Sequence, residues 1–164
     1  MKAGYQIYQQ GYGMVSNLSK GNFNLHETFY NNLLQVSPTV RNYARIADIA
    51  SMQAKLISEY KNKQALFRRS GRFSVEELSY LGDVYAGLVK KTLSDAEELA
   101  NILLSGKLRM SDAERINAID RIYTGSSDRL QFLRAFNNQG IALSLQRSKE
   151  AADTQTMSRL YGIK

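Results

Sequence analysis

The residues that most often carry enzyme chemistry are nearly absent from this chain. His26 is the only histidine, and there is no cysteine. This composition excludes disulfides, thiol nucleophiles, zinc–thiolate sites and zinc sites with two or more histidines. A serine triad would have to use His26, yet no serine lies in a G-x-S-x-G turn. We therefore predict a protein that is not an enzyme and that binds no cofactor.

Acidic side chains in the second half of the chain are the remaining candidate metal ligands. They are Asp112, Glu114, Asp120 and Asp128. Hard cations need several oxygens that converge on one point. Asp112 and Glu114 fall in the first turn of a predicted helix, where capping and the helix dipole account for acids, and Asp120 is flanked by two arginines. We interpret all four as structural and predict no metal site.

Positive charge is concentrated in one short run. The chain carries a net charge of +7, and residues 61–72 contain five cations and no acid. These cations are Lys61, Lys63, Arg68, Arg69 and Arg72. Such a run could bind anions, either phosphates such as those of a nucleic acid or acidic lipids. It could equally be a solvated helix end, where cations complement the helix dipole, and this second interpretation is the one we favour.

Tyrosines form the second candidate site. Tyr5, Tyr8 and Tyr12 recur at spacings of three and four, so they would line one face of a helix. Glycines at 4, 11 and 13 weaken that helix by up to about 1 kcal/mol each relative to alanine. A segment of this kind needs another surface to remain helical. The tyrosine face is therefore a candidate protein-binding surface, and the alternative is that it packs on the chain's own helices.

The elements around these residues are all predicted to be helices. Apolar residues make up 43% of the 164-residue chain, and there is a single proline, which suits one domain with long helices. The apolar spacing predicts helices over 2–19, 25–35, 38–68, 75–104, 112–137 and 141–160. The apolar spacing is less regular near 92–95, which suggests a bend in that helix. Gly125-Ser126-Ser127 predicts a kink or a break, and Gly140 predicts the start of a new helix.

Three serines mark helix starts. Ser37 precedes Pro38, and Ser74 and Ser111 each precede a glutamate by three residues, the pattern of a capping box. Gly71 predicts a left-handed helix end, and Gly162 predicts the end of the last helix. We expect a single all-α domain over 1–164, a bundle of five to six helices in which 38–68 and 75–104 form a long antiparallel hairpin. The expected core includes Ile46, Ile57, Leu81, Tyr85, Ile119 and Phe136.

Several longer runs resemble a known family. They are G-N-F-N-L-H at 21–26, V-S-P-T-V-R-N-Y at 36–43, K-L-R-M-S-D-A-E-R-I-N-A-I-D-R-I-Y at 107–123 and F-L-R-A-F-N-N-Q at 132–139. The chain is similar through these runs, and through R-L-Y-G-I at 159–163, to small exported helical proteins of conjugative transposons. Members of that family are often labelled TerB-like or tellurite-resistance proteins.

The resemblance implies a location and a role. Family members begin with a signal peptide and a further helix, so we expect a periplasmic or cell-envelope protein whose helix 2–19 continues a longer N-terminal helix. The alternative is a cytoplasmic protein. The family's setting implies an accessory or component of a conjugative, type IV secretion-like apparatus that contacts other protein subunits or itself. Two other functions stay open, namely nucleic-acid binding through 61–72 and a TerB-type response to metal or stress. We expect no membrane span in this chain.

Overall fold

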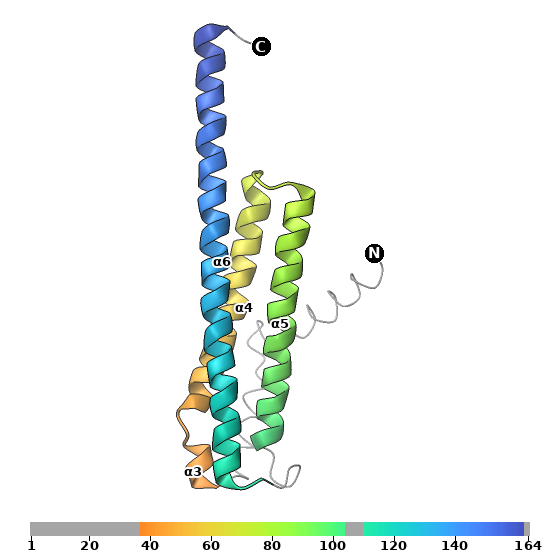
Figure 1. Cartoon of the computed structure of the whole chain (residues 1–164), viewed down its shortest axis with the longest axis vertical. Coiled ribbons are helices and arrows are strands. Elements are labelled where there is room, and N and C mark those ends of the chain that lie inside the picture. Colours follow the sequence, from red (N-terminus) through yellow and green to blue (C-terminus); the bar gives the residue numbers. More distant parts are fainter. Residues whose placement is uncertain (1–36, 104–109, 163–164) are drawn as a thin grey trace.

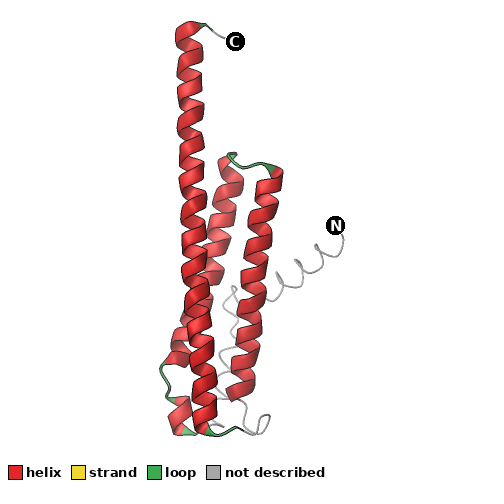
Figure 2. Ribbon diagram, viewed as in Figure 1, coloured by secondary structure: helices red, strands yellow, loops and turns green. Residues whose placement is uncertain are grey.

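The structure is a computed structural model, and it describes residues 37–103 and 110–162. Within these ranges the regular secondary structure is entirely helical, as the sequence predicts. Three long helices, α4, α5 and α6, run side by side, and one short helix, α3, lies beside the first turns of α6 (Figures 1 and 2). The predicted helices 2–19 and 25–35 lie outside the described residues.

Helices α4 (Arg45–Ser70) and α5 (Val75–Leu103) are joined by a tight turn and run in opposite directions (Figure 1). Gly71 ends α4 with a φ of 63°, the left-handed conformation that glycine adopts without steric cost. Ser74 then starts α5, because its hydroxyl accepts the Glu77 N–H at 3.2 Å while the Glu77 carboxylate accepts the Ser74 N–H at 2.8 Å. Both predictions from the sequence are confirmed here.

Helix α6 (Asp112–Tyr161) is a continuous helix of 50 residues, about 75 Å long. Ser111 forms the predicted capping box with Glu114 at its start, and Gly162 ends it in the left-handed conformation with a φ of 61°. The predicted kink at 125–127 and the predicted new helix from Gly140 are both wrong. Ser126 and Gly140 are buried inside the helix, so these small residues serve packing and do not mark its ends.

The predicted helix 38–68 is in fact interrupted near its start. Helix α3 (Pro38–Arg41), capped by Ser37 as predicted, ends at Asn42, and α4 begins at Arg45. The break allows Val40 to be completely buried and the Tyr43 hydroxyl to donate to Asp120 of α6 at 2.6 Å. The expected number of five to six helices is therefore wrong for the described residues, which form three long helices and the single turn α3.

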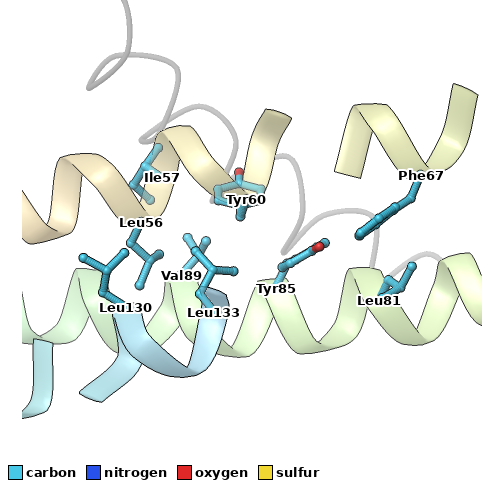
Figure 3. Close-up of a cluster of buried hydrophobic side chains, with 9 residues drawn as sticks. All are labelled: Leu56, Ile57, Tyr60, Phe67, Leu81, Tyr85, Val89, Leu130 and Leu133. Carbon is cyan, nitrogen blue, oxygen red and sulfur yellow. The ribbon is translucent and has the colours of Figure 1, made fainter. Parts of the chain in front are cut away.

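Two clusters of buried side chains hold the helices together. One cluster lies near the hairpin turn, and Figure 3 shows its members converging from α4, α5 and α6. The second lies near α3 and includes Val40, Ile49, Leu99 and Ile119. Of the six residues predicted for the core, Ile46, Ile57, Leu81, Tyr85 and Ile119 are buried. Phe136 is only half-buried, because its ring lies at the edge of the first cluster.

Candidate interaction surfaces

The last part of α6 projects beyond the rest of the molecule. Figure 1 shows this helix continuing past the turn between α4 and α5, and every residue from 149 to 162 is exposed. We call residues 149–161 the projecting end. It carries three large apolar side chains at helical spacing, with Met157 exposed to 53%, Leu160 to 73% and Tyr161 to 67%. Its threonines bond to the carbonyls one turn earlier, which leaves the backbone helical.

The basic run lies where α4 ends at the hairpin turn. Arg68, Arg69 and Arg72 are exposed, while Lys61 and Lys63 are half-buried. Arg69 Nε donates to the Ala65 carbonyl at 3.2 Å, one turn earlier in the helix. The structure therefore gathers the three arginines at one tip of the molecule, which we call the basic tip, and sets the two lysines further down α4.

Arg147 of α6 bonds to residues at this tip. Arg147 donates to both carboxylate oxygens of Glu77, at 2.8 and 2.7 Å, and to the Arg72 carbonyl at 2.7 Å. Its guanidinium also lies over the Phe73 ring, 5.7 Å from the ring centre. The Arg147 hydrogen bonds, and then the Ser74 N–H, lower the pKa of Glu77 from the ordinary value of 4.5 to about 2. The projecting end therefore begins directly after a fixed point.

A second exposed surface lies along α5 and α6. Tyr80 and Phe132 are exposed to 62% and 52%, and the half-buried Phe136 lies between them. The Phe136 ring is 6.2 Å from the Tyr80 ring, edge on, and 6.0 Å from the Phe132 ring, stacked. The Phe136 ring also lies edge on to the buried Tyr85 ring, with the ring centres 5.8 Å apart. We call this surface the α5–α6 face.

The α5–α6 face is hollowed at its other end, near the start of α6. The hollow has a volume of about 550 Å³. It is lined by Ser94, Glu97, Glu98, Asn101, Ile102, Met110, Ala118 and Arg121. The lining therefore combines apolar groups of Ile102, Met110 and Ala118 with a charged pair. In this pair, Arg121 Nη2 lies 3.4 Å from Glu98 Oε1. The face as a whole combines an aromatic half with a polar hollow.

Between these halves lies a buried ion pair. Arg129 of α6 bonds to Asp95 of α5, with only 13% and 6% of the two side chains exposed. Lys91 adds a second cation 3.2 Å from Asp95, and Ser126 accepts from Arg129 at 3.3 Å. This pair explains the irregular apolar phase near 92–95. The chain does not bend there; Thr92 and Asp95 are polar residues on the buried side of a continuous α5.

Two of the acids considered as metal ligands make contacts within the fold. Asp120 accepts from Tyr43 and pairs with Arg45 at 2.8 Å, while Glu114 belongs to the cap of α6. The Tyr43 hydrogen bond, followed by Arg45, lowers the pKa of Asp120 below its usual range. Among residues 37–103 and 110–162, no three His, Cys, Asp or Glu side chains lie close enough together to hold a metal ion. None of the helices described in those ranges is long and apolar enough to cross a membrane.

Only some of the candidate sites predicted from the sequence fall within the described residues. Tyr5, Tyr8, Tyr12 and His26 lie outside the described residues, whereas the basic run lies in them. Sequence reasoning missed both the projecting end and the α5–α6 face. For the projecting end, the available signal was the three large apolar residues at 157, 160 and 161. They stand at helical spacing in an otherwise polar segment. Comparison with known protein families, curated proteins and solved structures found no match to this chain.

Proposed function

We propose that this chain is a non-enzymatic interaction protein of the cell envelope, a component or accessory of a conjugative transfer apparatus. Its resemblance to exported proteins of conjugative transposons supports the setting. The projecting end of α6 supports the mode of action, and it is the observation that carries the proposal. In this proposal the three-helix part is the support, and the projecting end binds another protein subunit.

The projecting end has the properties of a helix that docks on a partner. The projecting end continues a helix that has already formed, so it needs no new nucleation, but all its side chains are exposed and none is packed. Met157, Leu160 and Tyr161 lie at i, i+3 and i+4, which places them on one side of the helix. Recognition of a helix by an apolar groove uses this spacing of anchor residues. The partner is therefore a subunit that offers an apolar groove.

The expected contribution of these anchors is substantial. Each large apolar side chain that becomes fully buried contributes about 1.5–3 kcal/mol. Part of this gain offsets the loss of translational and rotational freedom when two proteins associate. Arg147 fixes the helix just before the projecting end, so less conformational freedom is lost on binding than for a loose tail. Three anchors on a fixed helix suit a subunit contact.

The experiment is a transfer assay in a host that carries the conjugative element. The chromosomal copy is deleted and complemented by wild type, by Met157→Ser, Leu160→Ser, Tyr161→Ser, or by Thr154→Ser, Gln155→Ser, Thr156→Ser. The second triple is the matched control, because it alters the same helix turns without removing a large apolar side chain. We expect the first triple to reduce transfer at least tenfold at normal protein level and the control to restore it. Equal transfer by both variants would refute the proposal.

Nucleic-acid binding is the second candidate function, and the exposure of three arginines at the basic tip is the observation that favours it. Phosphate contacts make affinity fall steeply with salt. A variant with Arg68→Ser, Arg69→Ser and Arg72→Ser would then lose DNA affinity and show a shallower salt dependence. If that variant keeps full transfer while the projecting-end variant does not, the protein-contact function stands and the nucleic-acid function fails.

A further inference from the structure

The α5–α6 face has the features of a surface that another helix covers. Tyr80 and Phe132 expose most of an aromatic patch around Phe136, and Val84 and Leu88 add apolar groups on the same side of α5. Monomeric proteins rarely leave contiguous apolar surface without a use for it. The hollow at the far end of the face prolongs this surface toward the start of α6.

Gly87, in the middle of α5, is a second observation that suggests a covering helix. Gly87 is exposed, and a Cβ placed on it would meet no described atom within 4 Å. Glycine inside a helix costs about 1 kcal/mol relative to alanine, so its presence needs a reason. One turn of helix separates Gly87 from Val84 on this side of α5. Close approach of another backbone is the usual reason for such a glycine.

The chain itself has a segment that fits this face. Residues 1–36 precede Ser37, and helix 2–19 is predicted there with three tyrosines on one side. After Lys2 that helix carries no charge, so it can lie over the aromatic half without burying an unpaired ion. Tyrosine rings also suit the aromatic half, since a phenol can bury its ring against other rings and keep its hydroxyl in water. Glycines at 4, 11 and 13 permit the close approach that Gly87 allows from the other side.

The distances also suit an occupant from the same chain. Helix α3, which Ser37 caps, lies at the end of the molecule where α6 begins (Figure 1). The hollow lies toward the same end, since Met110 and Ala118 are among its lining residues. A helix over 2–19 would be about 27 Å long, and α5 rises about 33 Å from Tyr80 to Ile102. Residues 20–36 are ample to connect them. A tethered segment also has an effective concentration of order millimolar, which favours it over a separate molecule.

We propose that segment 2–19 packs on the α5–α6 face as a fourth long helix, with Tyr5, Tyr8 and Tyr12 against Tyr80, Phe132 and Phe136. The face and the three tyrosines thus contact each other within one chain. The inference is independent of the proposed function, which uses the projecting end. It makes the tyrosines part of the bundle and leaves the end of α6 as the surface for partners.

The absence of cysteine allows a direct test in the full chain. Gln9, beside the tyrosines, is changed to cysteine together with Gln139→Cys, one turn from Phe136, or with Asp83→Cys on the α5 side. The matched control is Gln9→Cys with Ser58→Cys, which is exposed on α4 outside this face. A short flexible bis-maleimide is added after circular dichroism has shown that each variant keeps wild-type helicity.

We expect cross-linking within one chain to be at least fivefold higher for a face pair than for the control pair. Changing Tyr5, Tyr8 and Tyr12 to serine in the same background should bring it down to the control level. Cross-links between two chains would overturn the inference in favour of a second copy on the face. Equal cross-linking of face and control pairs, or no effect of the tyrosine changes, would overturn it as well.

Discussion

Gly140 of α6 lies directly against the ring of Phe67 of α4. A Cβ placed on Gly140 would be 2.6 Å from Phe67 Cζ and 3.0 Å from Cε2. Phe67 is 1% exposed and is surrounded by the core cluster near the hairpin turn, so its ring has little freedom to move. Glycine at 140 is therefore a packing residue that lets α4 and α6 approach each other.

Gly140→Ala should destabilise the protein for this reason. Overpacking of a filled core costs about 1–3 kcal/mol, and the better helix propensity of alanine returns at most about 1 kcal/mol. Chemical denaturation measures the change in the free energy of unfolding. Gly82→Ala is the matched control, since its Cβ would meet only Gln64 Nε2 at 3.9 Å, and it should stabilise. If Gly140→Ala is as stable as Gly82→Ala, the described contact is wrong.

Tyr85→Phe should reveal the buried hydrogen bond between α5 and α6. The Tyr85 hydroxyl donates to Asn137 Oδ1 at 2.7 Å, and both residues are buried. Removal of the hydroxyl leaves the Asn137 oxygen without its donor, which costs about 1–3 kcal/mol. Burial raises the pKa of Tyr85 to about 12, so the ultraviolet titration of this tyrosine should lie above that of an exposed one. Tyr161→Phe, at an exposed position on the projecting end, should change stability by less than about 0.5 kcal/mol. Equal losses for the two variants would contradict the assignment.

Asp95→Ala should be among the most destabilising substitutions of a charged residue. It leaves the guanidinium of Arg129 largely buried without its carboxylate, and the loss of one partner from a buried pair costs on the order of 3 kcal/mol. Thermal and denaturant unfolding measure the effect. Asp83→Ala, an exposed acid on the same helix, serves as the control and should be nearly neutral. A double variant with Arg129→Leu should recover part of the loss, and additive losses would argue against the pair.

The ion pair at the hairpin turn predicts a pH dependence. The pKa of Glu77 is lowered from 4.5 to about 2 in the folded state, so the unfolded state binds more protons between these values. The stabilisation by ionised Glu77 is therefore complete above about pH 4.5 and is lost as the pH falls toward 2. Melting temperatures measured from pH 6 to 2.5 should fall less steeply for Glu77→Gln than for wild type. An unchanged slope in Glu77→Gln would count against the pair with Arg147.

The sequence was sufficient for the local chemistry of the helices and insufficient for their contacts. Serines 37, 74 and 111 and glycines 71 and 162 could be assigned because helix caps and helix ends depend on neighbours in sequence. Gly140 was misread because a helix-ending glycine and a packing glycine are identical until the opposing Phe67 is known. Asp95 disturbed the apolar pattern for a similar reason, since its partner Arg129 lies on another helix.

The candidate surfaces also differ in whether the sequence alone could reveal them. The basic run could be found by composition alone, and the structure adds that its arginines lie at the tip beside Arg147. The projecting end could not be found in this way. Its exposure depends on where α4 and α5 turn back relative to the length of α6, which is a property of the assembled helices.

The measurement that tests the central claim most directly is hydrogen–deuterium exchange of residues 149–161. The purified chain is compared with the chain isolated in the assembled transfer complex. In the purified chain, amides of the projecting end should exchange far faster than those of residues 119–137, which are packed on α4 and α5. In the complex, the amides around Met157, Leu160 and Tyr161 should exchange at least tenfold more slowly, because a partner groove covers them. Exchange at the same rate in both samples would contradict the claim that the projecting end is the binding surface.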